Sequence, residues 1–138
     1  MKLKKFLLFL VLALGVITIQ VSAQENSLKK SAADKAKVYT AKMIKTLALS
    51  KEQAIEVYRL RYELSLSLQI IHLKFADNQP QMIEFADEAK KDFQIGIKKI
   101  LKPSQIAILN QYKKDLVALK QGGDKTVELN PVVVEFDF

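Results

Sequence analysis

The sequence predicts an all-α protein of about four amphipathic helices that form a helical hairpin or bundle, followed by a short extended or β-like tail. Two observations support this prediction. Apolar residues recur at steps of three and four through most of residues 27–119. Capping or turn-forming residues interrupt the pattern near Ser50, Pro80 and Pro103.

Residues 1–23 are typical of a secretory signal peptide. Three lysines precede an apolar run of 14 residues, and small residues at Val21 and Ala23 fit a cleavage site. The alternative is an uncleaved membrane anchor, but a spanning helix needs roughly 20 apolar residues. We therefore expect a periplasmic protein, cleaved near Ala23, with no stable membrane anchor after cleavage.

The amino-acid composition excludes several kinds of functional site and favours some classes of binding partner over others. The chain has no cysteine, which excludes disulfides, thiolate metal sites and a cysteine nucleophile. The formal net charge is +7, and residues 24–138 hold 19 basic and 15 acidic residues. This mildly basic balance suits acidic polypeptides, anionic envelope polymers or a membrane surface better than nucleic acid. Residues 24–123 suffice for one small helical domain.

The first two helices are expected on either side of Ser50. Residues 27–46 form the first, whose apolar stripe is Ala32, Ala36, Tyr39, Met43 and Leu47. Ser50 and Gln53 match a capping box, so the second helix should start at Lys51. Its stripe is Val57, Leu60, Leu64, Leu68, Ile71 and Phe75. Residues 64–70 alternate with period two and alone would fit a strand, but the helical pattern on both sides favours a helix.

The third and fourth helices begin near prolines. Asn78 or Gln79 can cap the third, which carries Pro80 in its first turn. Its stripe is Met82, Ala86, Ala89, Phe93, Ile97 and Ile100. The fourth starts at Pro103, and its stripe is Ile106, Leu109, Tyr112, Leu116 and Leu119. Gly122-Gly123 should terminate it.

A short phrase, Leu-x-x-x-Gln, occurs twice at an interval of 52 residues. Its members, with the residues that complete each helix start, are Leu49, Ser50 and Gln53, and Leu101, Pro103 and Gln105. In the second copy Lys102 replaces the serine, so that helix end should be weaker by about 1 kcal/mol. We interpret both copies as structural helix starts rather than as a binding site.

Residues 124–138 differ from the helical part. Val127-Glu128-Leu129 and residues 132–138 have strand-like composition, and Asn130-Pro131 separates them. We expect an extended tail that packs on the helices or pairs with a partner chain. Its alternating Val and Phe ending is similar to the last strand of outer-membrane barrels, although one strand cannot close a barrel.

The second helix carries a further apolar stripe, which is the candidate binding surface. A helix that is apolar over more than half its circumference is either buried on two sides or offers surface to another molecule. One interpretation is the central helix of a four-helix core. The other is a dimer seam or an exposed groove with a basic rim. The stripe is Tyr58, Tyr62, Leu66, Ile70 and Leu73, and the rim cations would be Lys35, Lys42, Lys45, Arg59 and Arg61.

No pattern indicates catalysis. His72 is the only histidine, and no second metal ligand lies three or four residues from it. The chain has no glycine-rich phosphate loop and no nucleophile elbow. We therefore expect no enzymatic activity, no metal and no cofactor.

The order of these elements resembles the small periplasmic Spy/CpxP-like proteins, which are named for a repeated LTxxQ motif. The closest match is IKKILKPSQIAILNQYKK at residues 97–114, and Leu49, Ser50 and Gln53 match the first motif with Ser in place of Thr. The resemblance covers about residues 28–120. It implies an all-helical hairpin that dimerises into a curved cradle. It also implies an ATP-independent chaperone or envelope-stress modulator that holds unfolding clients on a basic and apolar concave face.

Two functional hypotheses follow. The leading one is a periplasmic, homodimeric protein that binds unfolded or envelope proteins through many weak apolar and basic contacts. The alternative is an interaction or sensor-inhibitor subunit that binds one dedicated partner, partly through its C-terminal tail by strand addition.

Overall fold

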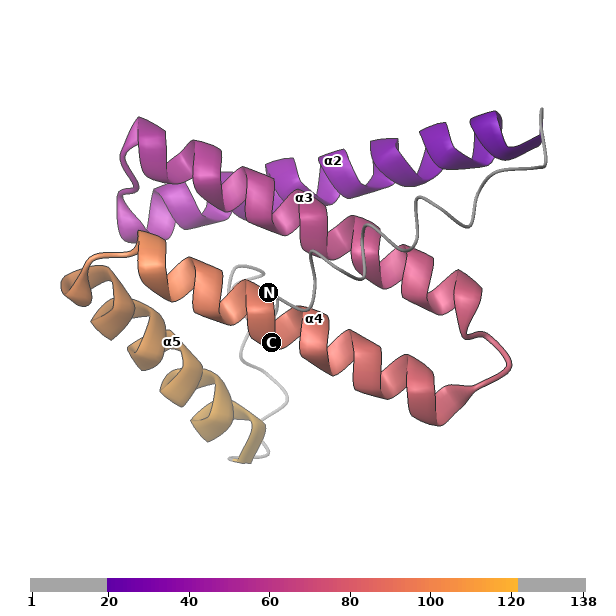
Figure 1. Ribbon diagram of the computed structural model, residues 1–138. Helices are drawn as coiled ribbons and strands as arrows, with labels where there is room; N and C mark the ends of the chain where they lie inside the picture. Colours follow the sequence, from indigo (N-terminus) through magenta and orange to yellow (C-terminus); the bar gives the residue numbers. More distant parts are fainter. Residues whose placement is uncertain (1–19, 122–138) are drawn as a thin grey trace.

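The computed structural model describes residues 20–121, which form four α-helices and no strand (Figure 1). In chain order these are α2 (Gln20–Leu47), α3 (Lys51–Lys74), α4 (Gln79–Ile100) and α5 (Pro103–Gln121). The all-α prediction is therefore confirmed for this range. Most of the predicted signal peptide and the whole predicted tail lie outside the described residues. Within residues 20–121, no helix is long and apolar enough to cross a membrane.

The predicted helix starts are confirmed at α3 and α4. Ser50 Oγ accepts a hydrogen bond from the Gln53 amide at 3.2 Å, and Gln53 Oε1 accepts one from the Ser50 amide at 3.0 Å. This capping box satisfies two backbone donors that the first turn of a helix otherwise leaves free. At α4 the cap is Asn78, whose side chain accepts from the Gln81 amide at 3.3 Å. Residues 64–70 are helical, so the strand alternative is wrong.

The first described helix begins at Gln20, earlier than the predicted Ser27. No glycine or proline stands between these positions, and Glu25 forms an i, i+4 ion pair with Lys29. Nothing in this stretch stops a helix, so α2 extends through it. At its other end Ala48 has φ of +48°, in the left-handed region that allows the chain to turn sharply before Ser50.

Helix α3 lies between α2 and α4 and packs along both (Figure 1). The predicted apolar stripes on α2 and α4 supply residues of the buried core between these helices, such as Met43 and Phe93. Tyr39 of α2 and Phe93 of α4 meet edge to face, with ring centroids 5.8 Å apart. The buried apolar core comprises Tyr39, Met43, Leu47, Val57, Leu64, Ile71, Ala89, Phe93, Ile97, Leu101 and Leu109.

Helix α5 packs on the rest of the described chain mainly near its start. Leu109 is buried there, Ile106 is partly buried, and α5 touches α2 in a small contact. Figure 1 shows α5 diverging from α4 after the turn that joins them. Within residues 20–121, α3 is therefore the helix that is flanked on both sides, by α2 and α4, and α5 adds residues near its start to the shared core.

Candidate functional site

The two glutamines of the repeated phrase lie together, although 52 residues separate them in the sequence. Gln53 Nε2 donates to Gln105 Oε1 at 2.9 Å, and Gln105 Nε2 donates to Gln53 Oε1 at 3.2 Å. Each oxygen also accepts from the amide that precedes its own helix: Ser50 for Gln53, and Lys102 for Gln105 at 2.9 Å. Each glutamine therefore caps its helix and binds its counterpart.

The second side-chain N–H of each glutamine donates to a backbone carbonyl at the C-terminal end of another helix. Gln53 Nε2 donates to the Ile100 carbonyl at the end of α4, and Gln105 Nε2 donates to the Leu47 carbonyl at the end of α2. A side-chain amide offers two donors and two acceptor sites, and both glutamines use all four. Only 7% of Gln105 is exposed, so these bonds also prevent the cost of a buried unpaired amide.

The two leucines of the repeated phrase belong to the apolar core or pack against it, and the proline stands at a helix start. Leu101 is buried in the core and Leu49 packs partly against it, whereas Pro103 is exposed at the start of α5. All of these contacts join helix ends to each other. The geometry agrees with the structural interpretation of the phrase.

The second apolar stripe of α3 runs beside the buried one, and its member Leu66 lies opposite the core. Leu66 follows fully buried Val57 by nine residues, which is about two and a half turns, so the two point in opposite directions. Tyr58 and Tyr62 stack with ring centroids 6.4 Å apart. Tyr58, Tyr62, Leu66 and Ile70 are half-buried, and the last member of the stripe, Leu73, is 51% exposed. Ile55, which was not predicted as a member, is 57% exposed near the start of the same helix.

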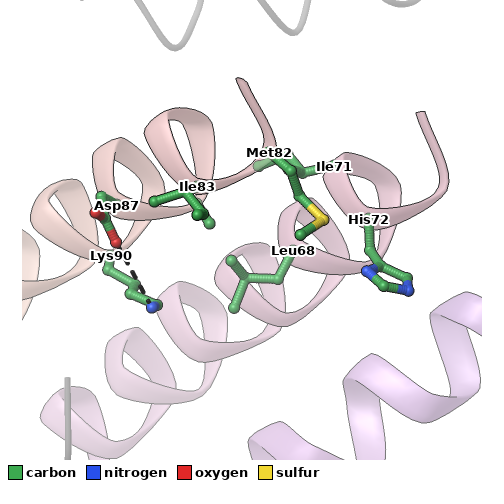
Figure 2. A pocket seen from close by; sticks show the side chains of 8 residues that line it. Leu68, Ile71, His72, Met82, Ile83, Asp87 and Lys90 are labelled. Atoms are coloured by element: carbon green, nitrogen blue, oxygen red, sulfur yellow. Dashed lines mark ion pairs between the residues drawn. The ribbon is translucent and has the colours of Figure 1, made fainter. Parts of the chain in front are cut away.

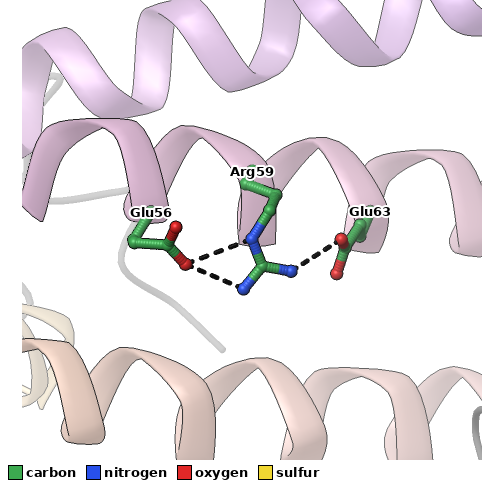
Figure 3. A network of polar contacts seen from close by, with 3 residues as sticks. All are labelled: Glu56, Arg59 and Glu63. Atoms are coloured by element: carbon green, nitrogen blue, oxygen red, sulfur yellow. Dashed lines mark hydrogen bonds and ion pairs between the residues drawn. The ribbon is translucent and has the colours of Figure 1, made fainter. Parts of the chain in front are cut away.

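Arg59 does not offer an uncompensated cation. Its guanidinium bonds Glu56 through Nε and Nη2, at 3.1 and 2.9 Å, and Glu63 through Nη1 at 2.8 Å (Figure 3). The hydrogen bond that Arg59 donates to Glu56, and then the one that it donates to Glu63, raise the pKa of Arg59 above its usual value. Two carboxylates surround one guanidinium, so this cluster carries a net negative charge, and the role of Arg59 as a rim cation stays a prediction.

The Arg61 guanidinium lies over the rings of two core aromatic residues. Its guanidinium carbon stands 4.9 Å from the ring centroid of Tyr39 and 5.9 Å from that of Phe93. This cation–π arrangement places Arg61 where α2, α3 and α4 meet. Its Nε is buried without a hydrogen-bond partner, as are the hydroxyls of Thr40 and Ser65.

The remaining predicted rim cations are lysines of α2. Lys35 and Lys45 are exposed and Lys42 is half-buried. Lys35 and Lys42 are seven residues apart and therefore lie on nearly the same line of the helix. Six lysines and only two acidic residues fall within α2, which makes this helix the most basic of the four described.

A shallow cleft between α3 and α4 was not predicted from the sequence. Its volume is about 240 Å³, and its lining residues are Leu68, Ile71, His72, Met82, Ile83, Ala86, Asp87 and Lys90 (Figure 2). Leu68 occupies the centre, His72 lies to one side, and an ion pair with Nζ of Lys90 3.7 Å from Oδ1 of Asp87 lies to the other. The sequence signal that could have indicated this cleft is Ile83, an apolar residue beside the predicted stripe of α4.

The cleft has no second histidine or cysteine beside His72. Across residues 20–121, no three His, Cys, Asp or Glu side chains are grouped so that they could hold a metal ion. The lining of the cleft is mainly apolar, with one ion pair and one histidine at its sides.

Comparison of the chain with protein-family models, with curated proteins and with solved structures found no match.

Proposed function

We propose that this protein is a periplasmic, ATP-independent chaperone-like or envelope-stress protein that binds unfolded polypeptides on its helical surface. The proposal rests on one structural observation above the others. Helix α3 carries a second apolar stripe beside its buried one, and Leu66 in this stripe points away from the core that α3 shares with α2 and α4. Leu73, at the end of that stripe, and Ile55, near the start of the same helix, are exposed.

Such a surface suits many clients because its contacts are weak and separable. Apolar side chains along a helix bind exposed hydrophobic segments of a client without requiring a particular sequence. The lysines of α2 attract acidic segments and accelerate encounter, although salt screens this attraction. Neither contribution needs nucleotide. The resemblance to Spy/CpxP-like proteins and the predicted export signal support the envelope location and a homodimeric state.

The test is suppression of aggregation of an unrelated, chemically unfolded protein that is diluted into buffer without ATP. Light scattering should fall when the chain is present in several-fold molar excess. Exchange of Leu66 and Ile70 for glutamine should reduce this suppression several-fold, because glutamine keeps helix propensity and charge but removes apolar surface. Circular dichroism verifies that the variant is folded.

Ile95→Gln provides the matched control. Ile95 is 52% exposed on α4 and lies outside both the stripe and the cleft, so its exchange should leave suppression unchanged. Absence of suppression by the wild-type chain would reject the proposal. Equal loss in the two variants would reject the stripe as the binding surface.

A further inference from the structure

Five lysines lie at the end of the molecule where the two glutamines join the helices. The turn between α2 and α3 and the turn between α4 and α5 both lie at this end (Figure 1). The bonds from Gln53 to the Ile100 carbonyl and from Gln105 to the Leu47 carbonyl hold these helix ends together. Five lysines stand within two residues of them, and we call the group the basic end: Lys45, Lys51, Lys98, Lys99 and Lys102.

The charge of the basic end is accessible and uncompensated. All five lysines are exposed, and none forms an ion pair with a carboxylate of residues 20–121. Residues 45–53 and 98–106 hold these five lysines and one acidic residue, Glu52, which gives a formal charge of +4. A lysine side chain is long and flexible, so a position about 3 Å along the axis from a helix end allows its ammonium group to reach the end face.

The turn between α3 and α4, at the other end of these two helices, has the opposite charge. Residues 72–88 contain one lysine and four acidic residues. Helix α3 has 24 residues and is therefore about 36 Å long, several times the ~8 Å over which physiological salt screens a charge. The two ends thus act separately, and an anionic surface attracts one and repels the other.

Helix stability does not account for all five lysines. A cation in the last turn of a helix is favourable because of the helix dipole, which explains Lys45, Lys98 and Lys99. Lys51 and Lys102 stand at helix starts, where a cation is unfavourable. Lys102 also takes the place that Ser50 has at α3, so α5 lacks a side-chain acceptor there. Residues that break a local rule in this way are typical of functional surfaces.

The composition of the basic end favours a lipid surface over an acidic polypeptide. Both arginines of the chain, whose planar groups suit paired bonds to single carboxylates, lie further along α3. Lysines act as point charges, and each adds to the attraction by a layer of anionic head groups. Two exposed isoleucines lie near them, Ile44 beside Lys45 and Ile108 in the second turn of α5. Apolar side chains among lysines can enter the boundary between head groups and acyl chains.

We propose that the basic end docks on a bilayer surface that carries anionic phospholipids, with the α3–α4 turn directed away from the bilayer. The contact is peripheral: ammonium groups neutralise head-group phosphates, and the two isoleucines add a shallow apolar contact. The second apolar stripe of α3 contains none of these residues, so the inference holds with or without client binding.

Co-sedimentation with vesicles tests the proposal. The chain expected after signal cleavage, residues 24–138, is used because the apolar run of residues 6–19 would itself enter a bilayer. At about 0.1 M salt it should bind vesicles of phosphatidylcholine and phosphatidylglycerol, and not vesicles of phosphatidylcholine alone. Exchange of Lys98, Lys99 and Lys102 for glutamine should lower the partition coefficient on the order of a hundredfold, since each lysine near an anionic surface contributes about fivefold.

Exchange of Lys30, Lys35 and Lys37 for glutamine is the matched control. It removes the same charge from exposed positions of α2 that lie ten or more residues before Leu47, so most of the binding should remain. Circular dichroism verifies that both variants are folded. Equal loss in the two variants, or no preference for anionic vesicles, overturns the proposal. Binding to poly-L-glutamate without binding to anionic vesicles would assign the basic end to acidic polypeptides and would also overturn it.

Discussion

The side-chain amides of Gln53 and Gln105 bind each other in both directions, with N–O distances of 2.9 and 3.2 Å. Through their remaining donors and acceptors they also bind the starts of α3 and α5 and the last carbonyls of α2 and α4. One pair of side chains thus joins four helix ends. This pair fixes the hairpin ends from which the outer face of α3 and the cleft extend.

The glutamine pair should behave as one unit in a double-mutant cycle. Gln53→Met or Gln105→Met alone leaves the other amide with unpaired atoms, so each should lower the free energy of unfolding by about 1–3 kcal/mol. The double variant removes both amides and should cost clearly less than the sum of the single losses. Urea denaturation measures all four proteins.

Additive losses would contradict this prediction, because they would mean that the two amides act independently. Methionine is chosen since it retains the length of glutamine and packs in irregular apolar space. The interaction free energy should fall within about 0.5–3 kcal/mol, which is typical of residues in one hydrogen-bond network.

The start of α5 should gain stability from the serine that the second phrase lacks. Gln105 already bonds the Lys102 amide, which is half of a capping box, and the Ile106 amide bonds the Lys102 carbonyl. Lys102→Ser adds an oxygen that can accept from the Gln105 amide, so the free energy of unfolding should rise by about 1 kcal/mol. Lys102→Ala, which adds no acceptor, is the control and should give no such rise in the same urea titration.

Ala48 occupies a backbone conformation that glycine adopts more easily. Its φ of +48° brings the alanine Cβ close to the backbone, a cost of roughly 1–2 kcal/mol that glycine avoids. Glycine also gains freedom in the unfolded chain, which offsets part of this. Ala48→Gly should therefore raise the free energy of unfolding by up to about 1 kcal/mol. A loss of similar size in thermal or urea unfolding would show that this turn does not hold the left-handed conformation.

Gly96 permits the close approach of α4 to α3. A Cβ at this position would lie 2.8 Å from Cδ1 of Leu60, closer than van der Waals contact allows. Gly96→Ala should thus combine a gain of about 1 kcal/mol in helix propensity with a steric cost. In a Leu60→Ala background the cost disappears, and the same exchange should then be stabilising. Equal effects of Gly96→Ala in both backgrounds would contradict the contact.

Local patterns predicted the helices and their buried faces because both depend on residues within two or three turns. Tyr39 and Met43 are buried as the three–four spacing indicates. The capping box at Ser50 was equally predictable, since its two bonds join residues three apart. The same local reasoning could have predicted the ion pairs of Arg59, because Glu56 and Glu63 lie at i−3 and i+4.

Contacts between distant helices could not be predicted in this way. The repeat identified Gln53 and Gln105 as equivalent, but their mutual bonds depend on where two turns bring the helix ends. Arg61 is predicted as a rim cation because it stands beside the second apolar stripe in the sequence, whereas its guanidinium lies over the rings of Tyr39 and Phe93 from two other helices. The cleft likewise depends on the angle between α3 and α4, which single-helix periodicity does not determine.

The first turn of α3 should make stability depend on pH in the acid range. A hydrogen bond from its own backbone amide, and then one from the Ser50 side chain, lower the pKa of Glu52 below its ordinary 4.5. A carboxyl group with a lowered pKa in the folded state contributes stability above pH 4.5, and this contribution is lost as pH falls through the folded-state pKa. Glu52→Gln should therefore be less stable than the wild type at neutral pH and equal to it well below pH 4.5. Urea denaturation of both proteins across this range measures the difference, and a gap that does not change with pH would show that the ionised carboxylate contributes nothing at this helix start.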